Sequence, residues 1–245
     1  MKKIVLPLFC SVLLFSGCEV LEEIGIEPIP GLETEENKLT NDEVIKGLKE
    51  ALNVGIKNSI DLTSMTDGFL GNLEIKLPFP PDAIKVKEKA LEWGLDGQVE
   101  KFVTTLNRAA EEATKEALPI FKDAILGMSI GDGFTILNGG DGAATSYLKD
   151  KTTAQLITAF SPKVEAAISK VKLTDYWEPI INKYNTAMNF TGGEKLNPDL
   201  NEYITERAIA GLFHMVEKEE NKIRKDPIAR VSEILKKVFG SVTGD

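Results

Sequence analysis

The chain has 245 residues, 42% of them hydrophobic, and its 38 acidic and 29 basic side chains give a formal net charge of −9 at pH 7. Because an acidic surface repels phosphates, this composition argues against nucleic-acid binding. The single histidine, His214, excludes a paired-histidine metal motif and any catalytic triad that does not use it, and its apolar surroundings favour a structural or surface role.

The N-terminus resembles a bacterial lipoprotein signal. Two lysines precede an apolar stretch over residues 4–15, and Ser16-Gly17 stands directly before Cys18. This stretch is shorter than the roughly 20 residues of a membrane-spanning helix, so we expect residues 1–17 to be removed as a signal peptide. The resemblance implies that Cys18 is diacylglyceryl-modified and N-acylated. With Cys10 in the removed segment, no disulfide or thiolate zinc site would remain.

Residues 18–39 are expected to form an acidic flexible tether. Positions 19–39 hold seven glutamates, together with Pro28 and Pro30, and show no sustained apolar period. A flexible segment of this length has a root-mean-square reach of roughly 25 Å, which would hold a globular domain clear of the lipid headgroups.

From residue 40 onward apolar residues recur at helical spacing, which predicts an all-α multi-helix bundle forming a single domain over residues 40–240. Thr40 or Asn41 is expected to cap a first helix that extends to about Ser59. Its apolar stripe is Val44, Leu48, Leu52 and Ile56.

The only clear strand signal is the alternation in residues 73–77, between the first helix and a second helix expected from about Pro81 to Trp93. One alternating segment without a partner does not make a sheet. We therefore expect at most one short hairpin or extended arm near residues 72–79.

The third helix carries an alanine-rich apolar face that Pro119 is expected to kink or end. The face consists of Val99, Phe102, Val103, Leu106, Ala110, Ala113 and Ala117. Thr152 or Thr153 is expected to open a later helix through Phe160. A capping residue followed by proline predicts three further starts, at Ser161-Pro162, Asn197-Pro198 and Asp226-Pro227. The last helix should stop at Gly240 and present Ile228, Val231, Leu235 and Val238 on one side.

A glycine-rich turn over residues 136–145 is the most distinctive internal stretch. It delivers the chain into a helix start, where free N–H groups can hold an anion, although Asp141 is expected to occupy that place as the N-cap. A structural interhelix turn is the favoured interpretation. The alternatives are an anion site or a calcium site using Asp132, Asn138 and Asp141, without the spacing of an EF-hand, a Walker loop or a dinucleotide fingerprint.

Asn107 and Arg108 interrupt the alanine-rich helix with polar side chains. The spacing predicts ion pairs of Arg108 with Glu112 and of Glu111 with Lys115. If Asn107 or Arg108 faces the bundle it needs a buried partner, for which Glu206 and Arg207 are candidates. A structural network is favoured over a functional polar pocket.

Two further groups of residues have a structural and a functional interpretation. The terminal basic residues could meet an anionic partner, but a solvated helix face is favoured: Lys222, Arg224, Lys225, Arg230, Lys236 and Lys237. The aromatic residues could line a ligand cleft, but core packing is favoured: Trp93, Tyr176, Trp177 and Tyr184.

Several segments in a fixed order resemble a bacterial family of exported lipoproteins known as domain of unknown function 4197. These segments are Gly68-Phe69-Leu70-Gly71-Asn72 with Ile75-Lys76-Leu77-Pro78, Asn107-Arg108-Ala109-Ala110-Glu111, Ile136-Leu137-Asn138-Gly139-Gly140-Asp141, Gly211-Leu212-Phe213, and Lys222-Ile223-Arg224 through Pro227-Ala229-Arg230. The resemblance covers roughly residues 40–240. It implies an all-helical exported domain and carries no activity, ligand or catalytic residue.

The leading functional hypothesis is a lipid-anchored helical domain of the cell envelope that acts as a binding or interaction module. It has no assigned catalytic residue, metal or cofactor. By resemblance to other lipoproteins, Glu19 in place of the aspartate associated with inner-membrane retention implies the outer membrane facing the periplasm, and the acids that follow leave surface exposure open. The alternatives are a carrier of an apolar small molecule in an interhelical cavity and a hydrolase that uses Glu111, Asp141 and Glu206.

Overall fold

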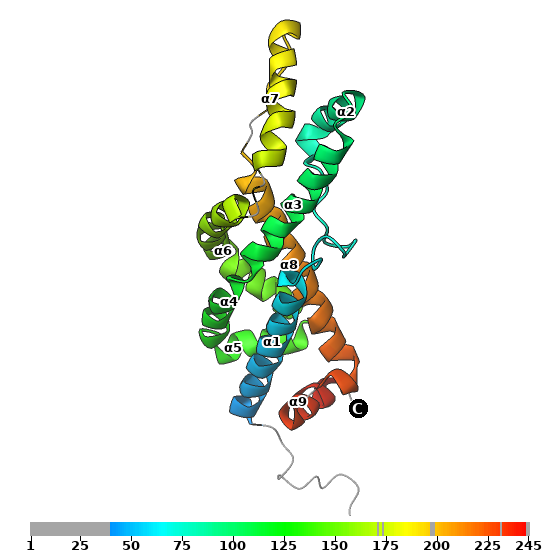
Figure 1. Cartoon of the computed structure of the whole chain (residues 1–245). Coiled ribbons are helices and arrows are strands. Elements are labelled where there is room, and N and C mark those ends of the chain that lie inside the picture. The colour runs from blue at the N-terminus through cyan, green and yellow to red at the C-terminus, as the bar shows by residue number, and fades with distance from the viewer. Residues whose placement is uncertain (1–39, 171, 173, 197–198, 231, 244–245) are drawn as a thin grey trace, which may run out of the picture. The chain divides into compact units, whose positions relative to one another are not determined.

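The structure is a computed structural model that describes residues 40–170, 172, 174–196, 199–230 and 232–243. The predicted signal peptide, Cys18 and the tether lie outside these residues. Within them the fold is all-α and contains no strand, as predicted (Figure 1). None of the described helices is long and apolar enough to cross a membrane. The elements are α1 (Asn41–Ser64), η3 (Pro81–Ala83), α2 (Ile84–Glu92), α3 (Asp96–Thr114), α4 (Ala117–Leu126), α5 (Ile130–Asn138), α6 (Ala143–Lys170), α7 (Thr174–Thr191), α8 (Asn201–Lys225), η4 (Pro227–Ala229) and α9 (Glu233–Thr243).

Helix α1 begins at the predicted cap but continues five residues beyond the predicted end. Thr40 and Glu43 form a capping box, in which the Glu43 N–H donates to Thr40 Oγ1 (3.2 Å) and the Thr40 N–H donates to Glu43 Oε2 (2.9 Å). Near the other end, the buried hydroxyls of Ser59 and Thr63 donate to carbonyls of their own helix. These hydroxyls therefore remain on the core face, and the helix continues to Ser64.

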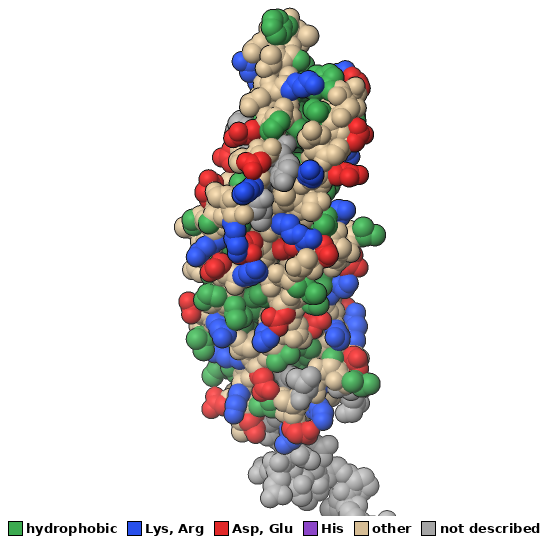
Figure 2. All heavy atoms as spheres, viewed as in Figure 1, with side chains coloured by type: hydrophobic (Ala, Val, Ile, Leu, Met, Phe, Trp, Pro, Cys, Tyr) green, Lys and Arg blue, Asp and Glu red, His purple; other side chains and the backbone are tan. Residues whose placement is uncertain are grey.

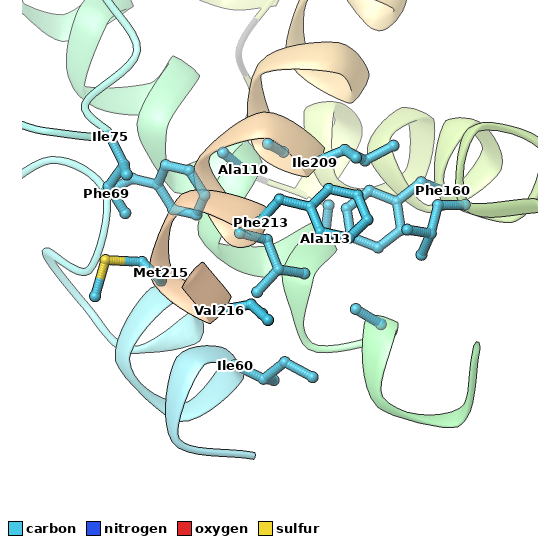
Figure 3. Packing of buried hydrophobic residues seen from close by; sticks show 14 of the residues in the cluster. Ile60, Phe69, Ile75, Ala110, Ala113, Phe160, Ile209, Phe213, Met215 and Val216 are labelled. Carbon is cyan, nitrogen blue, oxygen red and sulfur yellow. The ribbon is translucent and has the colours of Figure 1, made fainter. Parts of the chain in front are cut away.

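The core of the bundle is built around α8, which packs against α1, α3 and α6. Figure 3 shows Phe69 and Ile75 on one side of α8 and the rings of Phe213 and Phe160 on the other. Gly211 permits the contact between α8 and Phe69, because a Cβ at position 211 would stand 2.7 Å from Phe69 Cε1. On the opposite side, Phe213 meets Phe121 edge to face at a centroid distance of 5.5 Å.

The predicted arm is an irregular segment of turns between α1 and η3, and its alternation holds only in part. Ile75 and Leu77 are buried, whereas Leu73 is 89% exposed. The N–H groups of Ile75 and Lys76 both donate to the carbonyl of Asn72, at 3.2 and 2.8 Å. This turn takes Leu73 out of register with the two buried positions.

The predicted face of the third helix is divided between α3 and α4, and all its members except the half-buried Val103 are buried. The break comes at residues 115–116, earlier than predicted, and Pro119 lies in the first turn of α4. Proline is tolerated there because N–H groups in a first helical turn have no intrahelical acceptor.

The helix starts predicted at Thr152 or Thr153 and at Ser161-Pro162 are wrong, because α6 is continuous from Ala143 to Lys170. Both threonine hydroxyls donate to the carbonyl four residues earlier, at 2.6 Å, and cap nothing. Pro162 lies inside the helix, where it costs about 3 kcal/mol relative to alanine. The helix offsets this cost with one unbroken buried face: Leu148, Leu156, Phe160, Val164 and Ala167.

The C-terminal helix also differs from its prediction. Asp226-Pro227 leads into the three-residue η4, and α9 begins at Glu233 and passes Gly240 without stopping. Val238 is buried as expected, but Ile228 is 90% exposed, because the Asp226 side chain accepts from the Ile228 N–H in a local turn (2.9 Å). Asn197-Pro198 and Val231 lie outside the described residues.

Candidate functional site

The glycine-rich turn between α5 and α6 is occupied by a carboxylate of the protein itself. Glu220 of α8 accepts hydrogen bonds from the N–H of Ala144 (2.9 Å), the N–H of Thr145 (2.8 Å) and the hydroxyl of Thr145 (2.8 Å). The first turn of α6 therefore holds an anion, as such a helix start can. That anion is a side chain that lies 75 residues further along the chain and is only 8% exposed.

Arg224 follows Glu220 by one helical turn on α8 and contacts the end of α5, on the other side of the glycine-rich turn. It pairs with Glu220 at 2.9 Å and donates to the carbonyls of Ile136 (2.8 Å) and Leu137 (3.3 Å) in the last turn of α5. The anion thus faces a helix N-terminus and the cation a helix C-terminus, which is the favourable orientation for both dipoles. This buried ion pair locks the α5–α6 corner onto α8.

The residues predicted to form an anion or cation site at this turn do not converge. Asp141 is exposed, pairs with Lys225 and does not receive the N–H groups of α6. Asp132 is instead the third residue of α5 and forms a capping box with the N-cap Ser129, whose hydrogen bonds lower the pKa of Asp132. Asn138 is exposed. Among the described residues, no three His, Cys, Asp or Glu side chains are grouped as metal ligands.

Asn107 fastens the arm to α3. Its side chain is fully buried, accepts from the Leu77 N–H (2.8 Å) and donates to the Leu77 carbonyl (2.9 Å). The amide thereby supplies the two hydrogen bonds that a neighbouring strand would give. It also donates to the carbonyl of Val103 in its own helix.

Glu111, one turn further along α3, holds the preceding part of the arm. One of its oxygens accepts from the N–H groups of Phe69 and Leu70, both at 3.2 Å, and the other accepts from Arg108 at 2.6 Å. Arg108 reaches on to Asp67 at 2.7 Å. The hydrogen bond to Glu111, supported by the one to Asp67, raises the pKa of Arg108, which keeps it a permanent cation.

The predicted partners in this network were wrong. Arg108 pairs with Glu111 in place of Glu112, and Lys115 pairs with Glu112 in place of Glu111. Glu206 and Arg207 are exposed and take no part in these hydrogen bonds, because α8 turns its small or apolar residues toward the bundle at that level: Ile204, Thr205, Ala208 and Ile209.

These two networks leave no buried polar group for a ligand. In the described part of the chain, every buried side-chain nitrogen and oxygen has a hydrogen-bond partner. Of the three acids considered for hydrolysis, Asp141 and Glu206 lie apart. Asp141 contacts Lys225, which follows Glu206 by 19 residues of the same helix, or roughly 28 Å of rise, while Glu111 is held in the arm network.

One cavity between described helices is too small for a carried molecule. A cavity between α1, α6, α8 and α9, beside the Glu220–Arg224 pair, has a volume of about 20 Å³. That is space for one water, far below the several hundred Å³ of a small-molecule pocket. An apolar ligand in this cavity would require the helices to separate.

His214 is a surface residue, as predicted, and tethers the arm from outside. Its ring lies 3.0 Å from Glu74, which also accepts from Lys218 at 2.7 Å. Lys218 and then His214 lower the pKa of Glu74. The contact joins one exposed carboxylate to two exposed basic groups.

Two of the predicted aromatic residues, Trp177 and Tyr184, are buried, and so is part of the basic zone. Trp177 is buried and stacks on Phe102 at 4.6 Å, which agrees with the packing interpretation. The expectation of a solvated basic face is wrong for Arg224 and Arg230. Arg230 donates to the carbonyls of Ile223 and Arg224 near the end of α8, so both arginines serve helix ends.

The sequence did not reveal an open groove of about 720 Å³ between α1 and α4. Helix α1 lines it with Lys46, Lys49, Glu50, Asn53, Val54 and Lys57, and α4 lines it with Leu118, Lys122 and Leu126. Where Figure 1 places these helices, Figure 2 shows hydrophobic side chains among basic and acidic ones. Helical spacing marks both rows in the sequence, but nothing local indicates that they meet.

The fold and its internal networks define an all-α bundle whose buried polar residues hold turns and helix ends in place. The family model described as "Protein of unknown function (DUF4197)" matches residues 38–240, so the chain belongs to this family and the predicted family membership is confirmed. No curated protein and no solved structure gives a significant match.

Proposed function

We propose that this protein is an exported lipoprotein, anchored through acylated Cys18, whose helical domain is a binding or interaction module of the cell envelope. The signal-like N-terminus and the acidic segment up to residue 39 support the anchor and the tether. Glu19 after the anchor favours the outer membrane facing the periplasm, with exposure on the cell surface as a further destination.

The observation that supports the binding role is that buried polar side chains of the described residues are paired within the chain, whereas an open groove lies on the surface. Every described buried polar side-chain atom is hydrogen-bonded within the chain, and the cavity beside Glu220 holds about 20 Å³. The groove between α1 and α4 is open and far larger. Recognition of a partner would therefore take place on the outside of the bundle.

The anchor is tested by comparing the wild-type protein with Cys18→Ala in cell fractionation. The wild type should sediment with outer membranes and resist a salt wash, whereas the variant should be soluble after export. Crosslinking in intact cells tests the binding role. We expect wild-type protein to recover one defined envelope protein, while recovery of none, together with a copurifying apolar molecule, would contradict the proposal in favour of a carrier.

A further inference from the structure

The α1–α4 groove is basic on an acidic protein. Its lining holds four lysines and one glutamate, and Asp61 offsets one of the lysines by pairing with Lys57, whereas the whole chain carries −9. Lys46 and Lys122 are exposed and form no ion pair with any described residue. Their charge is therefore available to a partner.

The other two lysines are held by the fold. Lys49 Nζ donates to the Leu126 carbonyl at 3.0 Å, at the C-terminus of α4, and Lys57 pairs with Asp61. Lys49 thus closes one end of α4 against α1 and keeps the two walls of the groove together.

Apart from Glu50 and Asn53, the groove between the lysines is apolar. Val54 and Leu118 are half-buried, and Leu126 is 72% exposed although it lies beside them. Along α1 the lining extends from Lys46 to Lys57, a rise of roughly 17 Å or about three helical turns. A hydrophobic surface of this length between two helices is the arrangement in which a third helix packs.

We propose that the α1–α4 groove docks an amphipathic helix of a partner protein, with its apolar face on Val54, Leu118 and Leu126 and with acidic flanking residues opposite Lys46 and Lys122. This inference rests on the proposed function and names the class of partner. A bilayer surface fits less well, because a flat membrane cannot enter a concave groove. A single acyl chain would leave much of its surface in water, because the groove is open.

Site-specific photocrosslinking in intact cells tests this docking with the full-length protein. The photoreactive amino acid p-benzoylphenylalanine replaces Leu126 in the groove or, as a matched control, the 86% exposed Phe190 at the end of α7. Adducts are isolated and the attached peptide or lipid is identified by mass spectrometry. We expect position 126, but not position 190, to attach to a segment with an apolar stripe at helical spacing and an excess of Asp and Glu.

Charge reversal gives the second readout. Lys46→Glu combined with Lys122→Glu should lower the adduct yield roughly tenfold, the effect of turning two rim attractions into repulsions. Lys85→Glu combined with Lys195→Glu changes the net charge equally at exposed positions outside the groove and should leave the yield unchanged. Urea unfolding of each variant verifies that the fold is retained.

Four outcomes would overturn the groove assignment: adducts with phospholipid, adducts with a second copy of this chain, a yield insensitive to charge reversal, or no adduct at position 126. If position 190 attaches to a defined envelope protein while position 126 does not, the groove proposal fails and the interaction module stands. If neither these positions nor general crosslinking recover a protein, the proposed function fails as well.

Discussion

The buried pair Glu220–Arg224 is predicted to be a major local contributor to stability. Glu220→Ala removes three hydrogen bonds to the start of α6 and leaves Arg224, 8% exposed, without its ion partner. Breaking a buried ion pair from one side costs about 3–5 kcal/mol, because the remaining charge is uncompensated. We expect Arg224→Met to cost a similar amount, since it frees Glu220 and two carbonyls of α5.

A double-mutant cycle in urea unfolding measures the coupling between the two residues. The double variant should lose at least about 1 kcal/mol less than the sum of the single losses, because it leaves no lone buried charge. Asp61→Ala is the matched control, because Asp61 pairs with Lys57 at the same spacing on an exposed surface and should matter by less than about 0.5 kcal/mol. A Glu220→Ala loss below about 1 kcal/mol, or additive losses, would refute this account of the corner.

Three further predictions address the arm and the core. Asn107→Ala should destabilise the protein by about 2–3 kcal/mol, because the buried N–H and carbonyl of Leu77 lose their hydrogen-bond partner. It should also expose residues 72–79 to limited proteolysis. An arm as resistant to protease as in the wild type would contradict this. Gly211→Ala should lower the free energy of unfolding by about 1–3 kcal/mol, because the new Cβ clashes with the Phe69 ring. Gly97→Ala is the control and should not destabilise the protein, because nothing lies within 4 Å of its new Cβ. Equal unfolding midpoints of the two variants would count against the packing described. The lowered pKa of Glu74 implies a stabilising contribution that is present above the ordinary value of 4.5 and is lost as the pH falls through the lowered pKa. The difference in urea midpoint between the wild type and Glu74→Gln should therefore vanish in acid. A difference that stays constant with pH would exclude this linkage.

The sequence predicted features that depend on neighbouring residues. The start of α1 was predicted at Thr40 or Asn41, and the apolar face of α3 follows from spacing alone. The same local signals misled at Ser161-Pro162, where a capping residue before proline is typical of a helix start. There α6 continues because its buried face packs along α8, a contact that local sequence does not show.

The sequence predicted which residues of the candidate site are polar and structural, but it did not predict their hydrogen-bond partners. Asn107 was expected to need a buried partner, yet that partner is the backbone of Leu77, which no side-chain pattern identifies. The turn before α6 was expected to hold an acidic cap, but the cap is Glu220 from α8 and not the adjacent Asp141. Long-range packing decides which carboxylate reaches the free N–H groups.

The most direct test of the central claim is the mass of the N-terminal peptide of the protein isolated from its own membranes. We predict that the chain begins at Cys18 and carries a diacylglyceryl group and an amide-linked acyl chain. A soluble protein that retains Met1, with an unmodified Cys18, would contradict the lipid anchor and the envelope role built on it.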